Sequence, residues 1–401
     1  MRIFIPAFCL AALTVFWSMA AFGAPLPLYA RENADLLRAD WLRGGRPALS
    51  HEHLEELNDP ALTKVTRDFG PTVIRLADLP YRGQRVNSEK RVWSSYWYPY
   101  QEKDLFESPE GPGKSTLEKY DLLRTDRKRI PSKAAAVQKA GWSSAVANWE
   151  GLCDAWSIAA VLLPEPAAVA AYKTRGGSTV RFSVGDQKAL LLKSFEGISS
   201  ASLEIFGQRF DGGPARHVNG QSFGWIQPDL YPDQFHRFLE VVLLERHQPF
   251  VLDHDPSEAV WSEPVDGGNF EILPLAGRPD QVFVRAYIYP ARQLTRETRD
   301  QVGKNEHARE YNYILGGKLD ESGNLEVTYG IWLSRDFLRT SETYRDNEEL
   351  RQLVRIDSRR SHPDFVYVVP SSTLATRTPA NQEIDPDFVD LILRPSGTAD
   401  E

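Results

Sequence analysis

The sequence predicts an α+β protein in which a helix that carries a cysteine packs on a mainly antiparallel sheet. Two observations lead to this prediction. Apolar side chains recur at helical spacing over residues 154–163, directly after Cys153. From Phe250 onward, short apolar and alternating runs are separated by turn sequences, which is typical of strands. A length of 401 residues allows a sizeable core, in one large domain or two.

The first 23 residues have the pattern of a signal peptide. Arg2 supplies a positive start, an apolar stretch runs from Ile3 to Trp17, and small residues up to Ala24 offer cleavage sites. This pattern predicts a secreted or periplasmic protein, with an uncleaved anchor as the alternative. No later stretch of the sequence is apolar enough to span a bilayer, so we expect no stable membrane insertion after cleavage.

The rest of the chain divides into three predicted parts. Residues 24–90 are polar and helix-prone and form a helical N-terminal or propeptide-like segment, residues 91–372 form the main domain, and residues 373–401 form a C-terminal tail. The net charge of −8 argues against a nucleic-acid partner, because such proteins normally carry a basic domain or stripe.

Helical and extended segments alternate within the main domain. An aromatic-rich segment at 92–106 predicts a strand or an extended wall of a groove or core, and an alanine run predicts a helix at 131–139. Asp186 is the predicted N-cap of a helix over 187–195, and Pro232 opens another helix. Further strands are predicted at 250–252, 282–289, 311–318, 325–333 and 361–370.

Two groups of side chains resemble metal ligands without requiring a metal. Asp320, Glu321 and Asn324 lie in a turn sequence between two predicted strands, where calcium binding is possible but turn chemistry alone suffices. His51 and His53 stand beside acidic residues and are more typical of a solvated face. We therefore predict no metal site, and no cofactor is required by the sequence.

Cys153 is the one cysteine that remains after the predicted signal peptide, which contains Cys9, is removed. A single cysteine in an exported protein indicates an intermolecular partner or a reactive thiol. At the first turn of a buried helix, free N–H groups and the positive end of the dipole would stabilise a thiolate and an oxyanion. Papain-like proteases and transglutaminases share this arrangement. The alternative is a buried cysteine that acts as a small hydrophobe.

A nucleophilic thiol needs a base to take its proton and a third group to orient that base. Among the eight histidines, His236 and His254 are the best candidates, because each follows Cys153 in the chain beside an apolar element. Asp253, at the end of a short strand, is the natural orienting carboxylate. The spacing along the chain favours His236 over His254 as the base only slightly.

Several stretches, in conserved order, carry a resemblance to a known family: S-Y-W-Y-P-Y-Q (95–101), W-E-G-L-C-D-A-W-S (149–157), G-D-Q-K-A-L-L (185–191), F-H-R-F-L (235–239), F-V-L-D-H-D with A-V-W-S-E-P-V (250–265), and Y-N-Y-I-L, G-I-W-L-S and S-H-P-D-F-V-Y between 311 and 367. Together they resemble the transglutaminase-elicitor family of secreted acyltransferases. The resemblance covers about residues 93–370 and identifies the main domain as transglutaminase-elicitor-like and catalytic.

The resemblance implies a nucleophile, a base and an orienting acid, namely Cys153, His236 and Asp253. It also implies that Trp149, Trp156 and Trp261 bind substrate, with core packing as the alternative for Trp156. The sequence departs from the family pattern at several positions, and a Gly-Gly pair ahead of a strand turn is differently placed. Asp154 replaces a histidine, and Ser262 and Glu263 replace asparagine and glutamine.

The implied reaction is ping-pong acyl transfer, in which a Cys153 thioester forms with a glutamine side chain and passes to an amine. The partners are then protein or peptide substrates that supply glutamine, and amine donors. A cysteine peptidase or amidase on protein or cell-wall peptides is one alternative, because water can replace the amine. The other is a non-catalytic secreted binding module with the same fold. Asp154 gives that module some weight, since a negative charge raises the pKa of a nearby thiol.

Overall fold

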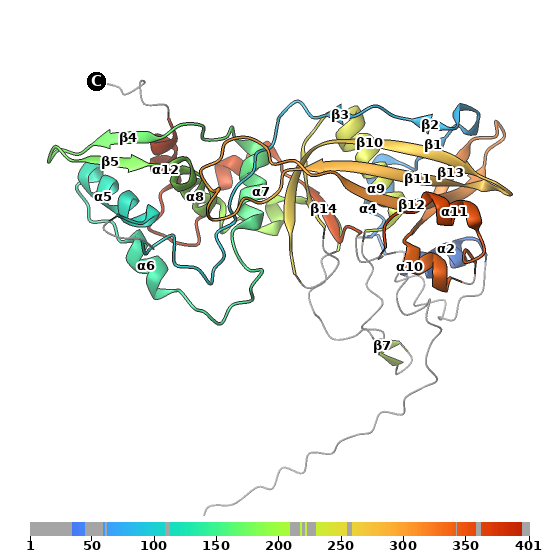
Figure 1. Cartoon of the computed structure of the whole chain (residues 1–401), viewed down its shortest axis with the longest axis horizontal. Helices are drawn as coiled ribbons and strands as arrows, with labels where there is room; N and C mark the ends of the chain where they lie inside the picture. Colours follow the sequence, from blue (N-terminus) through green and yellow to red (C-terminus); the bar gives the residue numbers. More distant parts are fainter. Residues whose placement is uncertain are drawn as a thin grey trace, which may run out of the picture.

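The computed structural model describes residues 34–44, 59–60, 62–108, 113–208, 217–218, 221–222, 230–254, 259–341, 343–357 and 362–394. The predicted signal peptide, His51 and His53, and the end of the tail lie outside these residues. The described part consists of a long sheet with a group of helices at one end (Figure 1). Its helices are all too short or too polar to span a lipid bilayer.

Four long neighbouring strands form the centre of a ten-stranded sheet: β10 (Ser262–Leu275), β11 (Arg278–Pro290), β12 (Arg309–Leu319) and β13 (Leu325–Trp332). Beyond β10 the sheet continues through β9 (Phe250–Asp253), β14 (Phe365–Val368) and β6 (Glu204–Gly207). All strand pairs in the described residues are antiparallel. The predicted combination of helices with a mainly antiparallel sheet is therefore confirmed.

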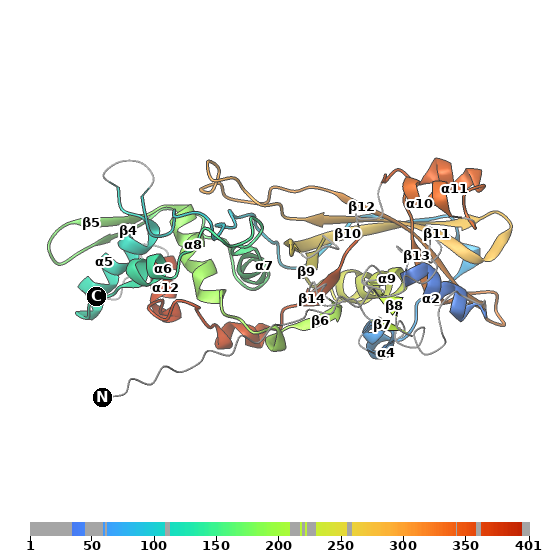
Figure 2. The same cartoon turned by 90° about the horizontal axis from the view of Figure 1, so that it is seen from below.

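Side chains alternate between the two faces of this sheet. Along β9 and β14, Leu252 and Val366 belong to one apolar cluster, whereas Val251 and Tyr367 belong to another. Two helical elements cover the first face: α9 (Pro232–Phe238) and a π-helix that continues it over Leu239–Glu245 (Figure 2). The second face packs against α7 (Cys153–Leu162) at the helical end of the molecule.

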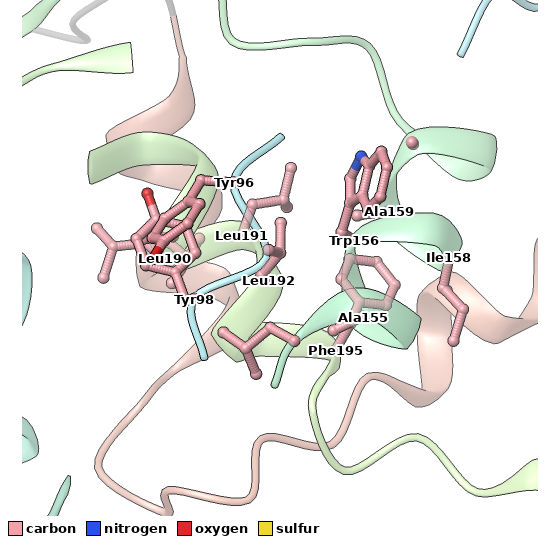
Figure 3. Packing of buried hydrophobic residues seen from close by; sticks show 14 of the residues in the cluster. Tyr96, Tyr98, Ala155, Trp156, Ile158, Ala159, Leu190, Leu191, Leu192 and Phe195 are labelled. Carbon is pink, nitrogen blue, oxygen red and sulfur yellow. The ribbon is translucent and has the colours of Figure 1, made fainter. Parts of the chain in front are cut away.

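The helical end surrounds α7 with elements from distant parts of the chain. They are α5 (Thr116–Lys128), α6 (Ala134–Ala140), the hairpin of β4 (Ala170–Lys173) and β5 (Thr179–Phe182), α8 (Val184–Phe195) and α12 (Pro386–Leu393). In Figure 3, Leu191 and Leu192 of α8 lie between two aromatic residues. These are Tyr98, from the segment at 92–106, and Trp156, from α7. The aromatic segment at 92–106 forms no strand, but it packs into this core as an extended wall, which was one of the two predictions.

The N-cap of α8 differs from the prediction. Ser183 is the N-cap, and its hydroxyl accepts a hydrogen bond from the Asp186 N–H at 3.2 Å. The Asp186 carboxylate in turn accepts the Ser183 N–H at 2.9 Å. Asp186 therefore closes a capping box from the third helical position instead of capping the helix itself.

The predicted N-terminal segment contributes to the sheet as well as supplying helices. It contains α2 (Ala34–Leu42), α4 (Lys64–Phe69), a 3₁₀ turn at Leu76–Asp78, β1 (Val73–Ile74), β2 (Tyr81–Arg82) and β3 (Val86–Asn87). β1 pairs with β13, and β2 and β3 pair with β10. Arg38 of α2 forms a buried ion pair with Asp233 at 2.8 Å, which ties α2 to the start of α9.

The remaining described elements are short. They are the 3₁₀ turns Ser200–Ser202 and Ser371–Thr376, the two-residue strands β7 (His217–Val218) and β8 (Gln221–Ser222), and the helices α10 (Arg335–Thr340) and α11 (Glu348–Leu353). α10 and α11 pack over the far end of the sheet, on the side where α2 lies.

Candidate active site

Cys153 is the first residue of α7, as predicted, and the segment before it is held tightly. The Leu152 N–H donates to the Trp97 carbonyl at 2.7 Å, and the Tyr100 N–H donates to the Glu150 carbonyl at 2.9 Å. Gly151 lies so close to the Trp97 ring that a Cβ there would stand 2.4 Å from Cε3. Glycine at 151 therefore permits the approach that fixes the start of the helix.

The Cys153 thiol is buried against the start of β10. The residue is 4% exposed, and its Sγ lies 3.6 Å from the Val260 carbonyl oxygen, to which the thiol donates. The backbone N–H groups of Ser262 and Asp154 donate to the sulfur. The sulfur is thus positioned by groups from α7 and from the β9–β10 strand ends.

Burial and two carboxylates make the thiol hard to ionise. Burial raises the pKa of Cys153 well above its usual value, and the negative charges of Asp154 and Asp253 raise it further. The N–H groups of Ser262 and Asp154 lower the pKa, but by less. Cys153 is therefore a protonated thiol at neutral pH in this arrangement.

Asp253, predicted to orient the histidine base, lies beside Cys153 because the sheet register places it there. It ends β9 directly opposite Ser262 of β10, and its Oδ1 accepts the Trp261 N–H at 3.0 Å. Its charge acts on the Cys153 thiol. The carboxylate therefore positions Trp261 while it faces the sulfur.

Two of the departures from the family pattern are bonded to each other. The Ser262 hydroxyl donates to the carboxylate of Asp154, and the Ser157 hydroxyl donates to the Ser262 carbonyl at 2.9 Å. These bonds tie the first turns of α7 to the start of β10. In the sequence, Asp154 and Ser262 are two unrelated departures from the family pattern. They form a pair only because α7 packs on the sheet.

Two tyrosines complete the surroundings of the thiol and were not identified as site residues from the sequence. Tyr100 hydrogen-bonds to Glu196 and faces Cys153 and Asp154, and burial raises the pKa of its phenol. Tyr367 of β14 faces Cys153 and Asp253, and burial raises its pKa well above the usual value. Both belong to stretches that carried the family resemblance, which was the signal available in the sequence.

His236, the predicted base, lies far from Cys153. It is fully buried, its Nδ1 is 2.8 Å from the Tyr313 hydroxyl, and its ring centroid is 4.4 Å from that of Phe270. Phe270 is eight residues along β10 from Ser262, which at about 3.3 Å per residue is roughly 25 Å. Burial lowers the pKa of His236. The structure therefore does not form the predicted Cys153–His236 pair, because α9 covers the opposite face of the sheet.

His254, the other histidine considered, follows Asp253 in the chain. Its Nε2 lies 3.8 Å from a carboxylate oxygen of Glu263, which Arg309 binds through two hydrogen bonds of 2.6 and 2.7 Å. Among the residues that the structure describes, no histidine hydrogen-bonds to the Cys153 sulfur.

The three tryptophans predicted to bind substrate occupy different environments. Trp156 is fully buried, and its Nε1 donates to the Trp93 carbonyl at 2.9 Å, so it is a core residue. Trp149 is half-buried against the same core. Trp261 is half-buried and meets the Trp97 ring edge-on at 5.3 Å, directly beside Asp253.

The predicted turn at Asp320 is formed by its own hydrogen bonds. The Asp320 carboxylate accepts the N–H groups of Ser322 and Asn324, each at 2.8 Å, and the Asn324 side-chain amide at 2.9 Å. Within the described ranges, no group of three or more His, Cys, Asp or Glu side chains is placed to hold a metal ion. The prediction that this turn needs no calcium stays a prediction.

Comparison with known proteins identifies the family of the segment that contains this site. Residues 114–284 match the family model described as transglutaminase elicitor. This segment belongs to the transglutaminase elicitor family. The family named by the sequence motifs is therefore confirmed over a range that includes Cys153, His236 and Asp253.

A solved structure is similar in fold. The GP42 transglutaminase from Phytophthora sojae superposes with a TM-score of 0.53 at 17% sequence identity, over 83% of this chain and 96% of that chain. At this identity the match shows a shared fold. A search of curated proteins found no match to this chain.

Proposed function

We propose that this protein is a thiol acyltransferase of transglutaminase type, with Cys153 as the nucleophile. One observation supports this most strongly. The thiol lies at the first residue of α7, against the start of β10, where two backbone N–H groups and Asp253 converge on it. The family of residues 114–284 and the fold shared with a transglutaminase are consistent with this chemistry.

The proposed reaction has two steps. In the first, the Cys153 sulfur bonds to the carbonyl carbon of a glutamine side-chain amide, the thiol proton passes to the amide nitrogen, and ammonia leaves. In the second, an amine bonds to the thioester carbon, and one amine proton returns to the sulfur as the C–S bond breaks. Burial of the thiol limits access of water, which would otherwise hydrolyse the thioester.

The substrate side of the proposal rests on the aromatic residues at the site. Trp261 and Trp97 meet edge-on beside Asp253, and Trp149, half-buried, lies in the segment just before Cys153. We propose that Trp261 and Trp149 contact the acyl donor, a protein or peptide glutamine, and that Trp156 supports the site from the core. We further propose that the protein acts outside the cytoplasm, which the signal-like pattern of the first 23 residues supports.

A second candidate function has its own supporting observation. The Cys153 thiol is nearly inaccessible, burial and two carboxylates raise its pKa, and its hydrogen bonds within the described residues include no histidine. A binding module that has kept the fold would show these features, because it does not need an activated thiol.

Incorporation of a labelled amine into a glutamine-rich protein tests the proposal, with the Cys153→Ala variant alongside. Incorporation by the wild type that is lost in the variant supports acyl transfer. Release of ammonia or peptide that depends on Cys153, without incorporation, supports the amidase or peptidase instead. If wild type and variant behave alike in every assay and Cys153 resists a thiol alkylator, the binding module is supported.

A further inference from the structure

Tyr367 lies on the same face of the sheet as the Cys153 site. It is paired with Val251 across β14 and β9, and two residues away Phe365 is paired with Asp253. Asp253 is in turn paired with Ser262 across β9 and β10. Because directly opposed residues share a face, as do residues two apart, the side chains of Tyr367, Asp253 and Ser262 all point toward α7.

The Tyr367 hydroxyl is buried, and its phenol oxygen has no well-aligned hydrogen bond from the described residues. The residue is 2% exposed. The Ser262 hydroxyl is close enough to interact with the phenol and to lower its pKa, but Ser262 donates its proton to Asp154. The ring itself is held by stacking on Phe365 at 6.1 Å.

A buried hydroxyl without a partner destabilises a protein, so such groups call for an explanation. Tyr100, the other phenol near the thiol, already bonds to Glu196. Tyr367 differs, because its donor faces Cys153 and Asp253 and has no well-aligned acceptor among the described residues. Burial keeps its pKa well above the usual value, so it remains a neutral donor at working pH. A carbonyl oxygen of a bound substrate is the partner that suits this donor.

We propose that Tyr367 is a catalytic residue that donates a hydrogen bond to the carbonyl oxygen of the amide bound at Cys153. This inference rests on the proposed acyl transfer. As the sulfur bonds to the carbonyl carbon, one electron pair of the C=O bond moves to oxygen, and the Tyr367 O–H bond stays intact while it stabilises the oxyanion. When the carbonyl reforms, the C–N bond breaks and ammonia leaves with the thiol proton.

Tyr367 also supplies a hydrogen-bond donor for the substrate oxygen, which the neighbouring side chains do not. Asp154 and Asp253 are both acidic, so an oxyanion between them would be repelled unless a donor stood close by. The N–H groups of Ser262 and Asp154 are directed at the sulfur. In the described part of the chain, the phenol is therefore a side-chain donor near the thiol that remains for the substrate oxygen.

A peptide aldehyde tests this inference without turnover. The aldehyde carbon takes the place of the glutamine amide carbon, and Cys153 adds to it to form a hemithioacetal, with the thiol proton moving to the aldehyde oxygen. The mature full chain is compared with Tyr367→Phe, which keeps the ring and removes the donor. Tyr344→Phe serves as the matched control, because Tyr344 is also fully buried but lies in the cluster at the far end of the sheet.

We expect the aldehyde to bind roughly 10- to 100-fold more weakly to Tyr367→Phe, and kcat for amine transfer to fall by about 10²-fold with little change in KM for the amine. The thermal midpoint of Tyr367→Phe should equal or exceed that of the wild type, because an unpaired hydroxyl is removed. Tyr344→Phe should bind the aldehyde like the wild type. A second variant with 3-fluorotyrosine at position 367 keeps the shape, strengthens the donor, and should bind the aldehyde more tightly.

Equal aldehyde binding by wild type and Tyr367→Phe would overturn the inference while the proposed function stands. Weaker binding together with a lower thermal midpoint, or the same weakening in Tyr344→Phe, would assign Tyr367 a structural role and also overturn it. If the wild type forms no adduct at Cys153, the proposed function fails and no oxyanion exists for Tyr367 to stabilise. Weaker aldehyde binding by the 3-fluorotyrosine variant would contradict the donor role directly.

Discussion

Cys153 and His236 lie on opposite faces of the ten-stranded sheet. Cys153 contacts the start of β10 on the face that packs against α7, whereas His236 hydrogen-bonds to Tyr313 on the face that α9 covers. The sheet therefore separates the thiol from the histidine that the family resemblance implied as its base. In this arrangement His236 is a core residue whose Nδ1 hydrogen-bonds to Tyr313, while its Nε2 lies 3.6 Å from a Glu240 carboxylate oxygen.

We expect His236→Asn to keep the chemistry of Cys153 and to lose stability. An asparagine retains a polar atom near Nδ1, but it leaves part of the cavity unfilled and weakens the bond to Tyr313. The free energy of unfolding should fall by about 1–3 kcal/mol in urea titrations. Aldehyde capture at Cys153 should stay within about threefold of wild type at a temperature where both are folded. A loss as large as that in Cys153→Ala, without loss of stability, would restore His236 as a catalytic residue.

The same histidine gives stability a pH dependence of known sign. Burial lowers the pKa of His236, so the unfolded chain binds a proton at a higher pH than the folded chain does. The stability that neutral His236 contributes is present above the unfolded pKa of about 6.5 and is lost as the pH falls below it. Urea unfolding between pH 7.5 and about pH 5 should therefore show a decline that is smaller in His236→Asn. An equal decline in both proteins would show that other groups cause it.

Replacing Asp154 should make the thiol easier to ionise. Its charge is the second cause, after burial, of the raised pKa of Cys153. In Asp154→Asn the rate of alkylation by iodoacetamide should rise several-fold at neutral pH, and its pH profile should shift to lower pH. Asp154→Glu is the control, because it keeps the charge and should keep the profile near that of the wild type. An unchanged profile in Asp154→Asn would mean that burial alone sets the reactivity.

Gly151→Ala tests how the start of α7 is fixed. The new Cβ would lie 2.4 Å from Trp97 Cε3, so the ring or the segment before Cys153 must shift. We expect a loss of about 1–3 kcal/mol in the free energy of unfolding and slower aldehyde capture. Gly141→Ala is a matched control, since its Cβ would meet nothing closer than the Val137 carbonyl at 3.8 Å. Similar stability of the two variants would show that Trp97 yields without cost.

Much of the fold follows from local patterns in the sequence. The helix after Cys153, the helix opened by Pro232, and the strands around the Asp320 turn all carry their own periodicity or turn residues. β10 does not. It contains Pro264 and the glycine pair 267–268, and its register shifts between Val265 and Gly268, so no alternation marks its first half.

The candidate site was less predictable because strand pairing between distant segments assembles it. Asp253 could be assigned from the family motif, and it lies beside the thiol. Tyr367 comes to the same face only through the pairing of β14 with β9, more than a hundred residues after its partner in the chain. His236 shows the converse. The motif around His236 matched the family. The apolar side chains of α9 determine which face of the sheet this helix covers, and the spacing of residues along the chain does not show which face that is.

The central claim is that Cys153 forms a thioester with a glutamine side chain, and mass spectrometry of the trapped protein tests it most directly. The mature chain is incubated with a glutamine peptide in the absence of amine, quenched in acid and digested. The account predicts that the fragment containing Cys153 gains the mass of the peptide less ammonia, and that hydroxylamine removes this adduct. An unmodified Cys153 fragment, while ammonia release proceeds equally in wild type and Cys153→Ala, would contradict it.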